Sequence, residues 1–284
     1  MKLRKKNSIV ITIFLTAALV LSLSPAVFGA EKLSGNEILV KLDQKSQVVT
    51  QGEMLSILTF DDKKPDSPES RLRVGALARR LTDEPRLTLI YFLKPAYMEG
   101  SIFLSRDTEE EETKMWLYLS ASQKKIQLSA SRKEGRFFGT ALSFEEIGSW
   151  SMSEEYSAES LEETTMEVGE ESVSAYKLEL TEKEGADPKF PKQTIWVGKD
   201  NWVLLQSKNY DDDGELKKEM KVKEMTTFEG NTVTKKLITT IVDTDHSTTV
   251  TYESRERPDQ DIPDSVFDAE NLEDFSPDKW GITE

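Results

Sequence analysis

The sequence predicts a mainly β chain of the α+β class, with one large up-and-down antiparallel sheet. Apolar runs with strand-like alternation recur along the chain, and turn residues such as Asp213-Gly214 and Glu229-Gly230-Asn231 separate neighbouring runs. Some of these strands are apolar on both alternating faces, whereas a simple antiparallel sheet leaves one face in water. We therefore expect a helix, a second sheet or a bound hydrocarbon to cover each side.

An amphipathic helix is the first element predicted after residue 30. Ser34 and Glu37 form a capping box, and Ile38, Leu39 and Leu42 form an apolar stripe. A short helix is predicted at residues 144–150. Strands are predicted at residues 53–60, 71–81, 86–94, 100–106, 114–119, 125–129, 175–181, 193–197, 202–210, 216–228 and 232–242.

The tail after Pro258 mixes proline and aspartate with spaced apolar residues, which favours a terminal helical turn that docks back onto the sheet. Its apolar residues are Ile262, Val266, Phe267, Leu272 and Phe275.

The strands with two apolar faces are concentrated in the first half of the chain. In one strand the odd positions and the even positions are both apolar: Leu87, Leu89, Tyr91 and Leu93 against Ile90 and Phe92. In another, Trp116 and Tyr118 oppose Met115, Leu117 and Leu119.

The N-terminal segment has the pattern of an export signal. A basic region is followed by an apolar run at residues 9–23, which is short for a membrane span of ~20 apolar residues. We expect residues 1–30 to be a signal peptide cleaved near Gly29 or Ala30, with an uncleaved anchor as the alternative, and residues 31–284 to be a single domain. The chain has no cysteine, which excludes lipidation at a cysteine, disulfides and thiolate chemistry.

The net charge of the chain limits the kinds of partner that we expect. The chain has 37 basic and 52 acidic residues, and loss of the four basic residues of the signal changes the formal charge from −15 to −19. Such a surface disfavours nucleic acid and anionic headgroups. The acidic runs 109–112, 154–155, 162–163 and 211–213 are typical of solvated loops and turns.

The sequence lacks recognisable catalytic or metal-binding motifs. His246 is the single histidine, and its context is typical of a turn or strand edge rather than of a catalytic base. Residues 209–220 partly match a calcium loop, but Met220 replaces the bidentate glutamate, so a hairpin turn is predicted. Glu145 and Glu146 are neighbours in the predicted helix, so their side chains point in different directions and do not easily act on one substrate. We expect no enzymatic activity, no cofactor and no metal site.

The middle of the chain resembles the outer-membrane lipoprotein-sorting protein family, relatives of the periplasmic carriers LolA and LolB. The resemblance rests on Pro95 with Gly100 and Leu104, on the WLYL strand at 116–119, and on the segment FFGTALSFEE at 137–146. Ser120 and Ala141 depart from the family's usual proline and aspartate. The family fold implies an incomplete, strongly curved antiparallel β-barrel wrapped around helices, with an apolar cavity under a helical lid.

The resemblance implies a periplasmic carrier that shields acyl chains during lipoprotein sorting or lipid transport. The alternative is a sensor that detects lipoproteins through the same fold. Cavity candidates are Leu89, Tyr91, Ile102, Leu104, Trp116, Tyr118, Phe137 and Phe138. With the opposite strand parity the cavity residues are instead Ile90, Phe92, Phe103, Leu117 and Leu119. Each of these residues could equally be plain core.

The expected partners are lipoprotein acyl chains or another lipid. A resistance-nodulation-division-type or lipoprotein-releasing transporter of the inner membrane and an outer-membrane acceptor are the expected protein partners.

Overall fold

A computed structural model describes residues 32–50, 52–80, 85–107, 113–148, 151–186 and 188–283, and it describes side chains of the first helix only as far as residue 45. The expected signal peptide and the acidic run at 109–112 lie outside these residues. Residues 33–284 form one compact unit. In the part of the chain just defined, no helix is long and apolar enough to cross a membrane.

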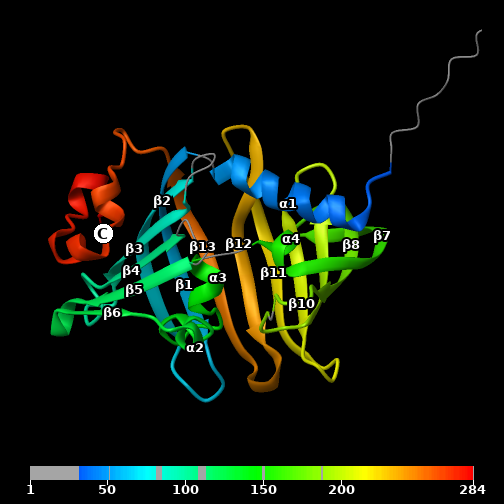
Figure 1. Ribbon diagram of the computed structural model, residues 1–284, viewed down its shortest axis with the longest axis horizontal. Coiled ribbons are helices and arrows are strands. Elements are labelled where there is room, and N and C mark those ends of the chain that lie inside the picture. Colours follow the sequence, from blue (N-terminus) through cyan, green and yellow to red (C-terminus); the bar gives the residue numbers. More distant parts are fainter. Residues whose placement is uncertain are drawn as a thin grey trace, which may run out of the picture. The chain divides into compact units, whose positions relative to one another are not determined.

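Thirteen strands of the described residues form one open, curved antiparallel sheet (Figure 1). They are β1 Gly52–Lys63, β2 Ser70–Arg80, β3 Leu87–Lys94, β4 Ile102–Asp107, β5 Thr113–Leu119, β6 Lys124–Gln127, β7 Tyr156–Val168, β8 Glu171–Glu182, β9 Lys192–Gly198, β10 Leu204–Tyr210, β11 Leu216–Phe228, β12 Asn231–Ile241 and β13 His246–Glu256.

The strand order confirms the predicted up-and-down sheet and adds one long-range pairing. Strands β1 to β6 follow one another across one half of the sheet, and β7 to β13 follow one another across the other half. The halves are joined where β1 pairs with β13, for example through Phe60 and Val250. Strands β6 and β7 are the two edges, so the sheet is an incomplete barrel.

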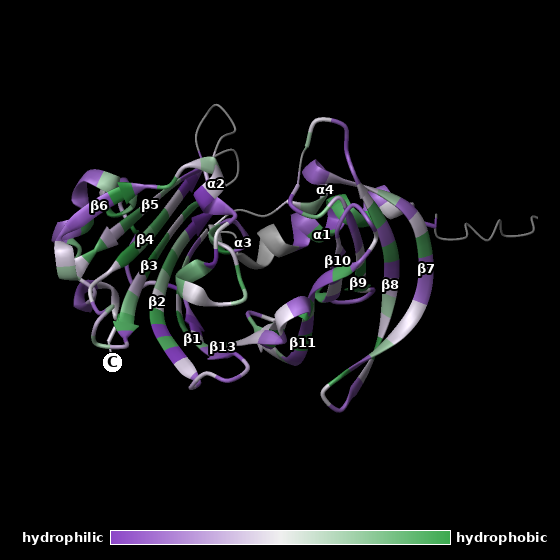
Figure 2. Cartoon of the chain, turned by 90° about the horizontal axis from the view of Figure 1, so that it is seen from below, coloured by the Kyte–Doolittle hydropathy of each residue, from purple (hydrophilic) through white to green (hydrophobic). Residues whose placement is uncertain are grey.

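Two strands were missed from the sequence. One is the central strand β13, whose first residue is His246, and the other is the edge strand β7, which contains the pair Glu162–Glu163 that was expected in a loop. Both strands are rich in threonine, serine or charged residues, so their alternation is weak. Strands β3 to β5 are mostly hydrophobic, whereas β7 and β8 carry long hydrophilic stretches (Figure 2).

The first helix begins as predicted. Helix α1, Gly35–Thr50, has a capping box in which the Ser34 N–H donates to Glu37 Oε2 at 2.7 Å and the Glu37 N–H donates to Ser34 Oγ at 3.3 Å. Its stripe of Ile38, Leu39 and Leu42 is buried. It packs with α4, Met152–Glu155, over one face of β7 to β9.

The remaining helices connect the two edges of the sheet. Helices α2, Ala130–Lys133, and α3, Phe144–Gly148, flank a 3-10 turn, Phe137–Gly139, in the segment between β6 and β7. This segment, α1 and α4 all lie on the concave side of the sheet (Figure 2). The chain thus covers its inner face with its own helices.

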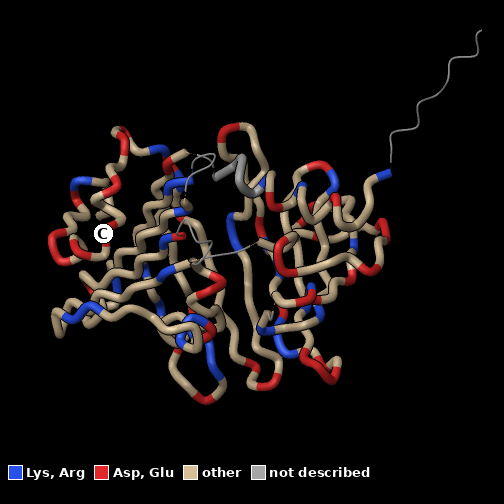
Figure 3. Tube along the Cα trace, viewed as in Figure 1, with Lys and Arg blue, Asp and Glu red and all other residues tan. Residues whose placement is uncertain are grey.

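The C-terminal tail, residues 258–283, docks on the sheet as predicted. It forms three 3-10 turns, Asp264–Phe267, Ala269–Asp274 and Asp278–Trp280, rather than one α-helical turn. Ile262, Phe267 and Leu272 are buried. Acidic residues gather along this tail and in the turns between strands (Figure 3).

Candidate functional site: an apolar pocket on the inner face

Strands β1 to β5 bury both of their faces, each under a different segment. We call the face under the C-terminal tail the outer face, and the concave face the inner face. Residues 128–148, which contain α2 and α3, cover the inner face, and we call them the inner cover. The expectation that both faces need an apolar cover is confirmed.

The eight cavity candidates divide between these faces. Six of them belong to the outer cluster, packed with tail residues: Leu89, Tyr91, Ile102, Leu104, Trp116 and Tyr118. Phe137 and Phe138 belong instead to the inner cover. The eight residues therefore do not line one cavity, because successive side chains of a strand point to opposite faces. A lipid-binding role for any of them stays a prediction.

The opposite parity set faces inward, with one exception. Ile90, Phe92, Phe103 and Leu117 belong to the inner cluster with Phe137. Leu119 is half-buried at the end of β5 and lies outside that cluster.

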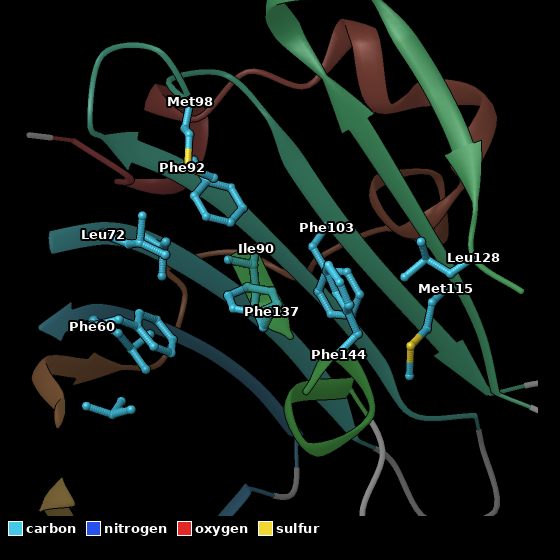
Figure 4. Close-up of a cluster of buried hydrophobic side chains, with 13 residues drawn as sticks. Phe60, Leu72, Ile90, Phe92, Met98, Phe103, Met115, Leu128, Phe137 and Phe144 are labelled. Carbon is cyan, nitrogen blue, oxygen red and sulfur yellow. The ribbon is translucent and has the colours of Figure 1, made fainter. Parts of the chain in front are cut away.

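Phenylalanine rings fill much of the space between the inner face and its cover. The Phe137 side chain is fully buried, with ring centroids 5.7 Å from Phe60, 5.6 Å from Phe103 and 5.4 Å from Phe144 (Figure 4). Phe138 has a left-handed φ of 46°, and its ring centroid lies 4.5 Å from that of Phe92, with the two rings tilted by 59°. A phenylalanine with positive φ costs energy and persists when packing holds it, so this part of the inner face is solid core.

Beside the phenylalanine cluster, the inner face is hollow. A cavity of about 280 Å³ lies over β1, β2, β3 and β13, under Ile147 and Gly148 of the inner cover. Its sheet side is formed by a row of large residues and then by small ones. The large residues of that row are Leu58, Phe60, Val74, Ile90 and Tyr252, and the small ones are Ser56, Ala76, Ala78 and Thr88, with Met54 of β1 beside Ala78.

The small residues create the space. Ala76, Ala78 and Thr88 lie on central strands yet remain half-exposed, since no side chain of the inner cover fills the volume above them. Ala78 pairs with Thr88, and Ala76 pairs with Ile90, so the small side chains adjoin one another across the two strands. Sequence reasoning missed them because it selected large apolar residues, although alanine at alternate positions of a strand is a readable sign of a gap.

Arginines occupy the end of the pocket opposite its large apolar residues. Arg80 follows Ala78 on the inner face of β2, and Arg86 precedes Thr88 at the start of β3. Burial and the neighbouring charge of Arg86 lower the pKa of Arg80 to about 10, so the Arg80 guanidinium is charged at neutral pH. Arg86 forms an ion pair with Asp107.

A third arginine reaches the pocket from β13. Arg255 pairs in register with Ser56, and its guanidinium carbon lies 3.6 Å from the centroid of the Tyr252 ring. This stacking is a cation–π contact that holds the guanidinium plane flat while its N–H edges stay available to acceptors.

An ion pair fastens the inner cover to the far half of the sheet. The Ser143 N–H donates to Glu146 Oε2 at 2.7 Å and the Glu146 N–H donates to Ser143 Oγ at 3.1 Å, which caps α3. Lys218 of β11 donates to Glu146 Oε1 at 2.6 Å. Burial lowers the pKa of Lys218, and the nearby carboxylate opposes that shift.

His246 takes part in a second fastening. Its Nε2 lies 2.7 Å from Asp62 Oδ1 and its Nδ1 lies 2.9 Å from Arg136 Nη1. Because a guanidinium only donates, Nδ1 is the acceptor and Nε2–H donates to Asp62. Thr248 Oγ1 accepts the Ala141 N–H at 2.8 Å and donates to Asp62 at 2.6 Å. These contacts tie residues 136–141 to β1 and β13.

This histidine and its partners lie outside the pocket lining. Burial raises the pKa of Asp62, but hydrogen bonds from Thr248, His246 and Lys64 outweigh it and leave the pKa below its ordinary value. Asp62 is therefore an ionised anchor of the inner cover.

Acidic groups concentrate where α4 meets α1. The Met152 and Ser153 N–H groups donate to Asp43 at 3.1 and 2.8 Å, so Asp43 caps α4 from a neighbouring helix. Burial, with the nearby charges of Glu145, Glu154 and Asp43, raises the pKa of Glu155 to about 7. Burial also raises the pKa of Glu145.

We compared the sequence and the fold with those of known proteins. A family model described as an "Uncharacterized protein"-like family matches residues 84–274. No curated protein matches the sequence significantly.

Solved structures share the fold. A DUF1329 family protein from Desulfovibrio piger is 22% identical with a TM-score of 0.73, over 84% of this chain and 97% of that one. An outer membrane lipoprotein-sorting protein domain from Vibrio parahaemolyticus is 18% identical with a TM-score of 0.70, over 84% and 98%. A LolA superfamily protein from Nitrosomonas europaea is 18% identical with a TM-score of 0.63, over 84% and 98%. At this identity the likeness is one of fold, and it confirms the lipoprotein-sorting architecture that the sequence motifs indicate.

Proposed function

We infer that this chain, which belongs to the family whose model spans residues 84–274 and has the fold of the LolA superfamily, is a carrier that shields an acyl chain from water. The observation that supports this function is the hollow on the inner face, with an apolar wall and half-exposed small side chains in the middle of a sheet. Burial of each methylene contributes about 0.8 kcal/mol, so one chain in this hollow gives useful affinity without any reactive group.

The size of the hollow limits the cargo. Its volume of about 280 Å³ is just below the range of roughly 300–1,000 Å³ that is typical of ligand pockets. One acyl chain suits this volume better than the several chains of a complete lipoprotein anchor. A larger cargo would require the inner cover to move away from the sheet, against the contacts of Glu146 and Asp62.

The proposed carrier works in the periplasm after export. In this proposal residues 1–30 act as a signal peptide, a transporter in the inner membrane loads the carrier, and an outer-membrane acceptor receives the cargo. The resemblance to the lipoprotein-sorting proteins supports both the compartment and the kinds of partner. The carrier performs no catalytic step, since loading and release need only a change in the affinity of the hollow for the acyl chain.

The test is to identify what the protein carries. The processed protein is purified from a membrane-containing host, and bound lipid is measured by native mass spectrometry and by extraction. We expect wild type to retain lipid and Ala76→Leu, which fills the hollow, to lose most of it. Ala121→Leu is the matched control, because it makes the same change at an exposed position.

Two results would contradict the carrier function. One is a wild-type protein that is empty and does not bind a fluorescent fatty acid. The other is equal lipid content in wild type and in a folded Ala76→Leu variant. Either result would redirect the search to protein partners, as expected of a lipoprotein sensor.

A further inference from the structure

The hollow has a different balance of basic and acidic side chains from the chain as a whole. Among the residues that the structure describes, its lining contains four arginines and one acidic residue, Glu146, although the whole chain has 52 acidic and 37 basic residues. Glu146 is itself engaged by Lys218. The net charge around this hollow is therefore positive in a protein that is strongly negative.

The charge is sorted along the strands. On the inner face of β2, Val74 at the apolar end and Arg80 at the basic end are six residues apart, which corresponds to roughly 20 Å. Strand β3 repeats the order in reverse, from Ile90 through Thr88 to Arg86. The hollow thus has an apolar end, a middle where small residues leave space, and a basic end.

The arginines differ in how they are engaged. Arg79 belongs to the outer face, since its Nη1 donates to the Ile262 carbonyl at 2.9 Å and it pairs with Asp264 of the tail. Arg86 pairs with Asp107 at the rim.

Arg80 and Arg255 are the best-placed groups to contact a bound molecule. Both line the hollow, and the five N–H donors of a guanidinium allow it to donate to a bound anion in addition to an intramolecular acceptor. Arg255 is also held flat on Tyr252, which reduces the conformational entropy lost on binding.

We propose that the hollow takes a single-chain amphiphile with an anionic head, a carboxylate or a phosphate, whose head contacts Arg80 and Arg255 and whose chain runs toward Phe60 and Ile90. This inference rests on the proposed carrier function and specifies its cargo. Arginine is suited to this task because its planar fork binds carboxylate and phosphate oxygens in pairs.

Four matched ligands test the head group. Isothermal titration below the critical micelle concentration compares dodecanoate, dodecyl phosphate, dodecanol and dodecyltrimethylammonium, which share a chain and differ in the head. We expect wild type to bind the two anions roughly tenfold or more tightly than dodecanol, with the cation weakest. The ratio of the two anion affinities distinguishes a fatty-acid head from a phosphate head.

Arginine variants locate the contact. Arg80→Gln and Arg255→Gln should each reduce anion affinity roughly tenfold and leave dodecanol binding unchanged. Arg73→Gln is the control, because Arg73 lies on the same strand, points to the outer face and pairs with Glu253. If Arg80→Gln does not fold, the rim variant Arg255→Gln and the wild-type ligand series still decide the question.

The outcomes separate this inference from the carrier function. If wild type binds dodecanol as tightly as dodecanoate, and the arginine variants change nothing, the head-group inference is overturned while the carrier function stands. If wild type binds none of the four ligands, both are overturned. Tighter binding of the cation would also overturn the inference.

Discussion

The two faces of strands β1 to β5 are both apolar, yet one is filled and the other is hollow. Neighbouring rows of paired residues show the difference. The outer row runs Leu55, Leu77, Leu89, Leu104 and Trp116, and the inner row beside it runs Ser56, Ala76, Ile90, Phe103 and Leu117. The outer row is large throughout, whereas the inner row begins with two small side chains. Side-chain volume, not hydrophobicity, therefore decides where a cavity forms.

The covers differ in the same way. The tail inserts Phe267, Leu272 and Ile282 into the outer face, each at most 2% exposed. At one end of the inner face, the inner cover inserts Phe137 and Phe144. Over Ala76 and Thr88, the inner-cover residues that line the hollow are Glu146, Ile147 and Gly148. An amphiphile can enter only where the cover lacks bulky side chains.

The largest expected effect concerns the filled part of the inner face. Phe137→Ala removes a ring that is fully buried among Phe60, Phe92, Phe103 and Phe144, and should lower the free energy of unfolding by about 3–5 kcal/mol. Urea denaturation measures it.

Leu89→Ala provides the outer-face counterpart, with an expected loss of about 2–5 kcal/mol. Tyr97→Ala, at a side chain that is 74% exposed, is the control and should change stability by less than about 0.5 kcal/mol. A loss below about 1 kcal/mol for Phe137→Ala would mean that the inner cover is not packed as described.

A second pair of variants contrasts adjacent residues on β2. A Cβ atom on Gly75 would lie 2.3 Å from Ile282 Cγ2, so Gly75→Val should displace the tail and cost about 1–3 kcal/mol. Ala76→Val points into the hollow and should change stability by less than about 1 kcal/mol in either direction.

Thermal unfolding measures the stability of the two variants, and titration with dodecanoate measures their affinity for the ligand. Gly75→Val should retain the ligand, and Ala76→Val should weaken it. The reverse pattern would place the binding site under the tail.

A third comparison concerns the ion pairs. Glu146→Gln leaves the buried Lys218 ammonium with a weaker partner and should cost about 1–3 kcal/mol. Glu224→Gln breaks a solvated pair with Lys236 and should cost clearly less stability than Glu146→Gln. Chemical denaturation of the two variants gives the values, and equal losses would show that Lys218 does not anchor the inner cover.

The smallest expected effect is a difference in pH dependence between the concave-side helices and the tail. The folded protein holds the Glu155 proton more tightly than the unfolded chain, because burial raises the pKa from 4.5 to about 7. The stability that this proton contributes is present below pH 4.5 and is lost as the pH rises through about 7. Melting temperatures should fall between about pH 5 and about pH 8, and Glu155→Gln should reduce that fall.

The tail should respond to pH in the opposite direction. A hydrogen bond from Arg79 lowers the pKa of Asp264 below 3.8, so the stability that ionised Asp264 contributes is present above that value and is lost in more acidic solution.

Glu159→Gln, at an exposed site on β7, is the control for Glu155→Gln. A slope that is unchanged in Glu155→Gln would rule out this carboxyl as its source.

Net charge and the arginines of the hollow lead to different expectations for a bound head group. The formal charge of −15 for the whole chain argues against anionic headgroups, and it describes the surface as a whole. In the proposed complex the head group contacts Arg80 and Arg255 at short range, whereas salt screens charges that lie more than about 10 Å away. The ligand series with different head groups decides between the expectation from net charge and the proposed anionic cargo.

The sequence by itself determined the sheet, the capped first helix, the docking of the tail and the resemblance to the lipoprotein-sorting fold. These features depend on local patterns: alternation, caps, turn residues and short motifs. It also established that some strands are apolar on both sides. Alternation defines two faces but does not say which one is concave.

Only the tertiary structure decided where the hollow lies and what lines it. Strand β13 pairs with β1 across most of the chain, and this pairing brings Arg255 beside Ser56. Arg80 and Arg86 meet because β2 and β3 are antiparallel neighbours. The cavity depends on the absence of a bulky side chain over Ala76 among the residues of the inner cover, 128–148. The alternate alanines of β2 are a local sign of a gap, but which segment covers them depends on contacts between segments far apart in the sequence.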